Sequence, residues 1–586
     1  MYLKIKFLLI VSMFMFLFAG EVILPTHQIH FIGQKHFDTH ALEDAFGIDN
    51  KSFFEFWEKD DPRIKNKLLP TLEATIKSFY HSEGFYDIEI GIKETNTTVT
   101  VEISENEPVR IDTIEIQSDY NLSSLIPMKK NDIFRAKSFI SSKNKIIETL
   151  LKEGYCSYDL DTKAYVDLDK HFVRLKYVLN KGGICTFGKL TLTGLKTIKD
   201  DVVISRVRTL EGKKFSTELV QNTSNNLYEL SAFDSVLINV DKKFYNVIPV
   251  DIAFEEISKP YHMEVGAGYD TYVGPRIQGQ ITKYNFLGDA QKLNLKASLS
   301  EKEQLLILSY FRPALFSLFG YSIDIGARTG YSNLEFDGFQ EEKAFSRVYL
   351  QYHDGRIKLK VGMAIESIDI TALDNLDDGA ELEQAVSEGL FLLAYPYIDF
   401  VYDARDSKLN PKYGYYLAAY SEVGLSREDD SSVYHKTQFE ARIIHTFSDL
   451  TLAAVGKVGV IDDSSGKGLP ESKYFFGGGS YSNRAYGFRE IGIITSPTED
   501  TIYGASSMAN LTFEADYPIA GDFYGAVFND NTMMTDMAYN FKGEIISSAG
   551  VGVRYMTPIG PFKLDVGFNV NKPSIYGISF QIGQSF

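Results

Sequence analysis

The sequence has few cysteines, few basic side chains and almost no long apolar stretch, and each shortage excludes a class of protein. Its only cysteines, Cys156 and Cys185, are too few for a zinc site made of cysteines alone. They predict either one disulfide in an oxidising compartment or two separate thiols. Basic residues number 60 against 78 acidic ones, and the net charge of -18 disfavours nucleic-acid binding, which needs a basic surface.

The one long apolar run stands at the N-terminus. A short basic start precedes apolar residues 7–18, and the small residues Ala19 and Gly20 follow. This pattern predicts a secretory signal peptide over residues 1–20; a retained membrane anchor is the alternative. No later segment approaches the ~20 apolar residues of a spanning helix, so a membrane role must use strands.

The region 21–258 repeats one pattern three times, which is typical of a domain array. Each repeat opens with a strand, contains two helical segments and closes with two alternating strands. We therefore predict three α+β domains of the order β-α-α-β-β, over residues 21–107, 108–182 and 183–258. The predicted opening strands lie at 28–33, 111–116 and 189–194, and the predicted second helices at Pro70–Ser82, Ser138–Glu153 and Thr217–Leu230.

The remainder, residues 259–586, alternates apolar and polar residues and is rich in Tyr, Phe and Gly, with 36, 42 and 45 in the whole chain against 17 Pro and one Trp. Strands of ~10 residues separated by turns are typical of membrane barrels. We predict an all-β, 16-stranded antiparallel transmembrane barrel. A soluble β-sandwich, the alternative, rarely needs so many strands.

The last strand ends on an aromatic residue. Phe580, Ile582 and Phe586 share one face of this strand. A terminal strand that finishes on Phe resembles the C-terminal signal by which outer-membrane proteins are recognised for insertion.

A long loop between two predicted strands carries a distinctive motif. Arg484, Ala485, Tyr486, Gly487 and Phe488 follow the segment 475–479, which reads Phe-Phe-Gly-Gly-Gly. The motif resembles the inward-folded loop of the BamA/TamA family, in the Omp85 superfamily of assembly barrels, where a Gly stands in place of Ala485.

This resemblance implies a partner for the loop arginine. In the family, the arginine pairs with an aspartate in an aromatic-x-Asp-x-Gly motif, and Phe528 and Asp530 match that motif, with Thr532 in place of the Gly. A bidentate pair inside the lumen would fix the loop. The alternative is a solvent-facing Arg484 and an unrelated strand aspartate.

Three weaker matches extend the resemblance over the barrel: residues 285–288, 402–406 and 550–561. The three upstream repeats are similar to POTRA domains, and three of them before a barrel most resembles the TamA subfamily. The resemblance implies an outer-membrane barrel with its POTRA-like domains in the periplasm. It implies outer-membrane lipids and client outer-membrane proteins, autotransporters among them, as partners, together with a TamB-like protein anchored in the inner membrane.

The family also implies a lateral seam between the first and last barrel strands. Gly266, Gly268, Gly577 and Gly583 stand in these strands, and Gly weakens a strand interior. The hypothesis is a weakly paired seam that opens toward client strands or lipid. The alternative is that these glycines relieve crowding in a closed barrel.

Enzymatic motifs are missing from the sequence. The Gly-rich segment 477–480 lacks the Lys-Ser/Thr of a phosphate loop, and Asp403 with Asp406 fits a turn better than a catalytic pair. His36 and His40 carry the weak signal of a metal site, for which surface histidines are the simpler interpretation. We predict no catalysis, no cofactor and no metal. Two further alternatives are a general BamA-type insertase and a two-partner secretion pore that exports its substrate through the lumen.

Overall fold

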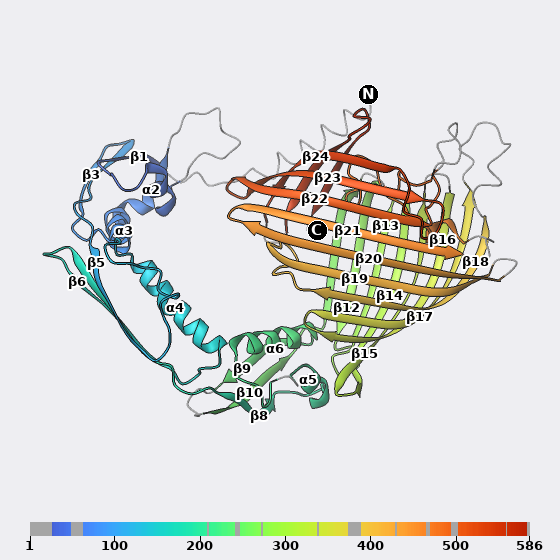
Figure 1. Ribbon diagram of the computed structural model, residues 1–586, viewed down its shortest axis with the longest axis horizontal. Coiled ribbons are helices and arrows are strands. Elements are labelled where there is room, and N and C mark those ends of the chain that lie inside the picture. The colour runs from blue at the N-terminus through green and yellow to red at the C-terminus, as the bar shows by residue number, and fades with distance from the viewer. Residues whose placement is uncertain are drawn as a thin grey trace. The chain divides into compact units, whose positions relative to one another are not determined.

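The computed structural model describes residues 26–48, 62–207, 210–240, 246–270, 274–336, 339–372, 388–427, 431–463, 469–493, 502–557 and 560–582. The predicted signal peptide, Gly583 and Phe586 lie outside the described residues. The chain forms two compact units (Figure 1). The first consists mainly of residues up to Phe187, and the second mainly of residues from Gly188 onward.

The first α/β domain has a four-stranded sheet in the order β2 (Arg63–Lys65), β1 (Thr26–Ile32), β4 (Thr98–Ser104) and β3 (Glu89–Glu94). Its helices are α2 (Thr39–Ala45) and α3 (Leu69–Ser82). Helix α3 buries Leu72, Ile76 and Tyr80. The spacing of four places these side chains on one face, which packs in the core with sheet residues such as Val99 and Val101.

The first domain adds the short strand β2 to the predicted β-α-α-β-β order, and the second domain differs from that order at one other point. Its sheet runs β5 (Arg110–Ser118), β7 (Phe172–Asn180), β6 (Asp159–Asp167), and its one helix is α4 (Ala136–Lys152). The segment 119–135 between β5 and α4 forms turns where a first helix is predicted. Pro127 explains the difference, because a proline disfavours helical backbone at Ile126 and removes a donor. The apolar residues of this segment, Leu122 and Ile126 among them, are nevertheless buried.

Cys156 and Cys185 form a disulfide, with 5.9 Å between their Cα atoms. Of the two alternatives left open by the sequence, the structure has the bonded form. Cys156 follows α4, and Cys185 directly precedes the first strand of the third domain. The bond therefore fixes the connection between the second and third domains at its start.

The third domain has a sheet in the order β8 (Thr186–Thr193), β10 (Val247–Glu256), β9 (Phe233–Val240), with helices α5 (Asp200–Val207) and α6 (Thr217–Glu229). Both predicted helices are present. Most of this domain belongs to the second compact unit, together with the barrel.

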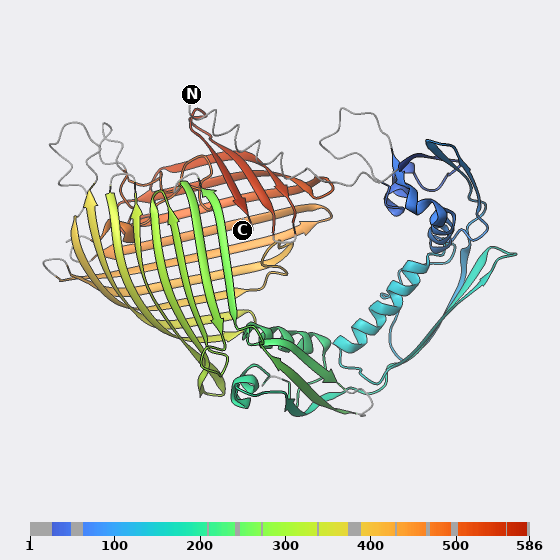
Figure 2. The same cartoon turned by 180° about the vertical axis from the view of Figure 1, so that it is seen from behind.

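The rest of the chain forms one 16-stranded antiparallel sheet in which neighbours in sequence pair in order from β11 to β26 (Figure 1 and Figure 2). Two-residue turns such as 355–356 and 448–449 lie at one end, and the connection 464–506 lies at the other. In outer-membrane barrels the short turns are periplasmic. The strands are β11 (Tyr261–Asp270), β12 (Gly274–Tyr284), β13 (Lys292–Ser300), β14 (Glu303–Leu318), β15 (Tyr321–Glu335), β16 (Phe339–Asp354), β17 (Ile357–Ala372), β18 (Gly389–Asp403), β19 (Tyr413–Arg427), β20 (Ser431–Phe447), β21 (Leu450–Asp463), β22 (Ser507–Ala520), β23 (Phe523–Thr535), β24 (Ile545–Tyr555), β25 (Phe562–Asn569) and β26 (Tyr576–Ile582).

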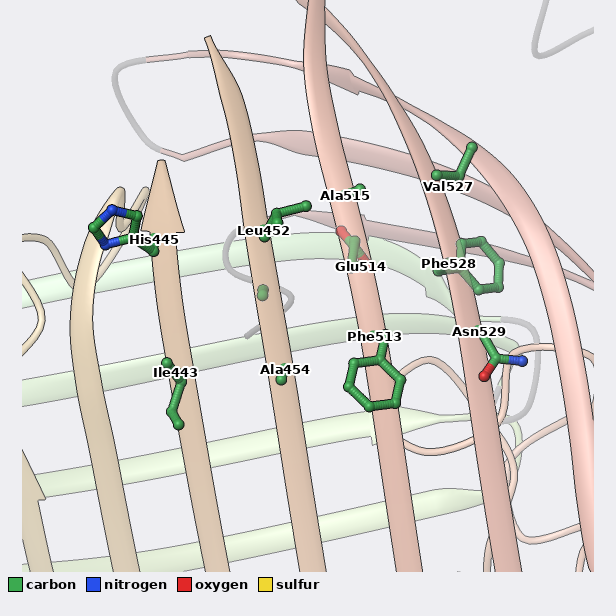
Figure 3. A pocket seen from close by; sticks show the side chains of 11 residues that line it. Ile443, His445, Leu452, Ala454, Phe513, Glu514, Ala515, Val527, Phe528 and Asn529 are labelled. Carbon is green, nitrogen blue, oxygen red and sulfur yellow. The ribbon is translucent and has the colours of Figure 1, made fainter. Parts of the chain in front are cut away.

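The outer face of the wall is apolar, as strand alternation predicts. Ile443, Leu452, Phe513 and Val527 stand on neighbouring strands and are all 40% or more exposed. Figure 3 shows them around a shallow groove of about 490 Å³ that is also lined by Ala454. No described helix is long and apolar enough to cross a membrane.

The lumen is unusual because part of it is a hydrophobic core. Along β18 the inward residues Phe391, Tyr395 and Tyr397 are aromatic, and all three are buried. They pack with residues of the loop between β21 and β22, including Phe475 and Tyr503. A barrel interior is ordinarily polar, so these inward aromatics indicate a lumen that is filled by the loop.

Candidate functional site

The loop between β21 and β22 is the centre of the candidate site. Three of its segments, 475–477, 491–493 and 503–505, pair with one another through backbone bridges at Phe475–Ala505, Gly477–Ile491 and Ile493–Tyr503. The loop is therefore a folded element with its own hydrogen bonds, and it presents its tip to the inner faces of β22 to β26.

Arg484 at the loop tip lies against Asp530 of β23. Its Nε and Nη2 donate to the two carboxylate oxygens of Asp530 at 2.9 and 3.0 Å, and its backbone N–H donates at 3.0 Å. Both side chains are almost fully buried, at 4% and 1% exposed. The sequence analysis predicted this pair, and the structure brings the two residues together in the bidentate geometry that fixes orientation as well as distance.

The pair belongs to a larger ionic network that the sequence analysis did not find. Arg484 also donates to Glu514 of β22 and, at 3.4 Å, to Asp565 of β25. Arg554 of β24 donates to the same two carboxylates. Buried charges are stable only where each has partners of opposite sign. The loop tip is thus bound to four consecutive strands of the wall, β22 to β25.

Neighbouring motif residues complete the contact. The Arg484 guanidinium lies 3.4 Å from the centroid of the Phe528 ring, within cation–π range. Ala485 is buried and its φ is not positive, so the residue that replaces the family's Gly is compatible with this backbone. The Tyr486 hydroxyl accepts a hydrogen bond from Asn569 of β25 at 2.7 Å.

The remaining motif residues are Gly487 and Phe488. The Gly487 N–H donates to Glu490 at 2.6 Å, and Phe488 is half exposed. Asn483, just before the motif, is fully buried and donates to the Ile546 carbonyl at 3.1 Å.

Two paired glycines allow the loop backbone to approach the wall. Gly567 of β25 and Gly577 of β26 are opposite each other. A Cβ on Gly577 would lie 2.5 Å from the Arg484 carbonyl oxygen, and one on Gly567 would lie 2.8 Å from the Arg484 carbonyl carbon. Close approach of the loop therefore explains Gly577. Gly266 of β11 is different, because a Cβ there would meet Gln278 at an ordinary 3.4 Å.

A second ionic anchor holds the loop to the opposite part of the wall. Lys473 is buried, and its Nζ lies 3.0 Å from Glu366 of β17 and 3.1 Å from Glu422 of β19. The hydroxyl groups of Tyr395 and Tyr434 donate to these glutamates. This anchor was not predicted from the sequence. Its only sequence signal is a charged residue at an inward position of a strand, such as Glu366, which shows no partner until the fold is known.

The first and last strands of the sheet are its two ends: among the described residues, no ladder joins β11 to β26. Gly266 and Gly268 lie in β11, and Gly577 lies in β26. Phe580 of the predicted C-terminal signal is 55% exposed on the outer face, and Ile582 closes β26. The weakly paired lateral seam stays a prediction about function.

The candidate histidines and aspartates that carried only a weak signal in the sequence have hydrogen-bond or ion-pair partners within the fold. The ring of His36 lies 2.7 Å from Glu105 and that of His40 lies 3.1 Å from Glu43. Among the described residues there is no group of three side chains that could hold a metal ion. Asp403 forms an ion pair with Arg405. Asp406 accepts hydrogen bonds from backbone N–H groups of the same turn, among them that of Lys412.

Comparison with known proteins agrees with this architecture. Residues 285–586 match the Omp85 superfamily domain. The chain is 21% identical to "Outer membrane protein assembly factor BamA" of Nitratidesulfovibrio vulgaris over 92% of its own length and 70% of that protein, and 20% identical to BamA of Neisseria meningitidis over 95% and 78%. Among solved structures, BamA from Haemophilus ducreyi lacking POTRA domains 1–3 has a TM-score of 0.52 and 17% identity, covering 81% of this chain and 99% of that one.

The domain match covers more than half of the chain, so the protein belongs to the Omp85 superfamily. It is an outer-membrane β-barrel preceded by POTRA-like domains. The similarity to the solved BamA barrel shows a shared fold.

Proposed function

We propose that this protein is an assembly factor that inserts or translocates client outer-membrane proteins. The observation that carries the proposal is the combination of an anchored lumenal loop with a sheet whose end strands, β11 and β26, lack a ladder between them in the described residues. Its relatives are named outer-membrane protein assembly factors, which supports the same function. The proposed function is non-enzymatic.

The proposed mechanism uses unpaired strand edges. An edge strand offers free N–H and C=O groups, to which an extended client can add by main-chain hydrogen bonds with little dependence on sequence. The POTRA-like sheets offer such edges at β3 and at β6, and the barrel offers β11. A client would pass from periplasmic edges to the barrel seam, which opens laterally.

The filled lumen argues against export through the barrel. Arg484 and Lys473 bind the loop to different strands of the wall, and the core around Phe475 and Tyr395 occupies the space between. A substrate passing through the lumen would have to break both buried ion pairs. Lateral insertion requires neither to break.

Within the superfamily we propose the TamA type rather than a general BamA-type insertase, and the three POTRA-like sheets among the described residues support this proposal. The associated partners would be outer-membrane lipids and a TamB-like protein, and lipid transport would be a second function. Depletion followed by outer-membrane proteomics separates the types. Global loss of barrel proteins indicates the general insertase; loss of a few clients, with capture of a large β-rich partner, indicates the TamA type.

The seam itself is tested by cross-linking. Cysteines at outward positions Val265 of β11 and Ile578 of β26 would lock the seam when oxidised, and we expect client insertion to stop and to recover on reduction. The matched control places cysteines at Val551 and Val566, which are opposite each other in the continuous part of the sheet. Full insertion by the oxidised seam variant would refute lateral opening.

A further inference from the structure

A cavity of about 410 Å³ lies between the inner barrel wall and helices α5 and α6. Its wall residues stand at the short-turn end of β13 to β18, which is the periplasmic end of an outer-membrane barrel. Arg206 of α5 and Glu229 of α6 form its other side. All lining residues belong to the second compact unit.

The acidic groups that line the cavity are already paired. Asp324 accepts two hydrogen bonds of 2.8 Å from Arg206. Glu229 lies 2.7 Å from the His353 ring, and Asp403 pairs with Arg405, which is outside the cavity. Each carboxylate of the lining therefore already has a hydrogen-bonding partner beside it.

The basic groups are in excess. In the part of the chain that the structure describes, the side chains of Arg356, Lys358 and Lys408 form no hydrogen bond and no ion pair, although all three line the cavity. A fourth cation, Lys292, donates to the Glu229 carbonyl at 2.8 Å and to the Ser231 hydroxyl at 3.1 Å, neither of which carries a charge. Cations focused in a recess with low-dielectric walls attract anions strongly.

We propose that this cavity binds a phosphate-bearing ligand. A phosphate group presents several oxygens in different directions, which suits donors that converge from a turn, a strand and a second turn: Arg356, Lys358 and Lys408. The volume is far larger than an inorganic phosphate needs and falls in the range of small-molecule sites, so a phospholipid headgroup fits as well as a soluble phosphate compound. The site would add anion recognition at the periplasmic mouth of the barrel, independently of how clients are inserted.

The test measures binding to the full-length protein in a neutral detergent at low ionic strength. The probes are inorganic phosphate and dihexanoyl phosphatidylglycerol, with dihexanoylglycerol as the phosphate-free probe. The variant Lys358→Gln/Lys408→Gln should bind at least about tenfold more weakly, a loss of ~1.4 kcal/mol. The control Lys412→Gln removes a lysine of the same turn region that does not line the cavity, and it should bind like the wild type.

The outcomes separate the two sources of phosphate. Binding of phosphatidylglycerol alone, weakened in the double variant, identifies a lipid headgroup; equal weakening with inorganic phosphate identifies a site for the phosphate group itself. The proposal is overturned if neither phosphate probe binds, if dihexanoylglycerol binds equally well, or if the double variant matches Lys412→Gln. A gel-mobility shift between heated and unheated samples verifies that each variant is folded.

Discussion

Replacement of Arg484 by methionine should destabilise the folded barrel more than loss of any surface ion pair. The change removes the shared cation of Asp530, Glu514 and Asp565, whose side chains are at most 3% exposed. Removing one partner of a buried ionic group costs about 3–5 kcal/mol, because the remaining charges stay buried without compensation. Arg554 contacts two of these carboxylates and will offset part of the loss, so we expect the lower half of that range.

The assay is urea unfolding of the full-length protein in phospholipid vesicles, followed by the mobility shift of the folded barrel on gels. Arg484→Lys keeps the charge but loses the bidentate geometry with Asp530. The stability of this variant should lie between those of the wild type and Arg484→Met. The matched control is Lys302→Met. It removes a partly exposed pair with Glu335 at 3.9 Å, for which we expect less than about 1 kcal/mol. If the unfolding free energies of Arg484→Met and Lys302→Met differ by less than about 1 kcal/mol, the network does not hold the loop.

Three further perturbations address the loop and the first α/β domain. Gly577→Ala should loosen the loop tip and cost about 1–3 kcal/mol, because its Cβ would lie 2.5 Å from a loop carbonyl, whereas Gly266→Ala should be close to neutral in the same unfolding assay. Lys473→Met should raise the single-channel conductance of the barrel in planar bilayers by releasing the second anchor; an unchanged conductance would show that the aromatic core alone closes the lumen. Burial opposes ionisation of Glu105, but hydrogen bonds from His36 and nearby backbone N–H groups lower its pKa overall. Since the folded-state pKa is the lower one, this stabilisation is complete above the unfolded value of ~4.3 and is lost as the pH falls through the folded value. The first domain should therefore become protease-sensitive on acidification, and Glu105→Gln should flatten that dependence.

Local patterns predicted most of the fold. Helix α3 was expected at Pro70–Ser82 and spans Leu69–Ser82, because apolar residues at spacings of three and four need no distant information to define a helical face. The 16-stranded antiparallel sheet followed from alternation in the same way. The second domain shows the limit of such patterns. Its segment 119–135 has apolar residues at helical spacing, but Pro127 disfavours a helix there. The segment forms turns instead, and these turns bury the apolar side chains.

The candidate site was only partly predictable. Arg484 and Asp530 could be paired because a family motif links them, and no spacing rule would have done so. Nothing in the sequence connects Lys473 with Glu366 and Glu422, which stand 107 and 51 positions before it. These partners meet because strands β17 and β19 direct alternate residues into the lumen, which the loop that carries Lys473 enters.

By itself, the sequence determined which segments are strands or helices, which face of each strand is apolar and where the loop motif lies. Tertiary structure alone decided that the charges of the loop are shared among several strands, and that Gly577 faces a loop carbonyl rather than open space. The physical reason is the range of the interactions. Periodicity reflects contacts between residues a few positions apart, whereas buried charges must be neutralised by whichever side chains the folded barrel brings together.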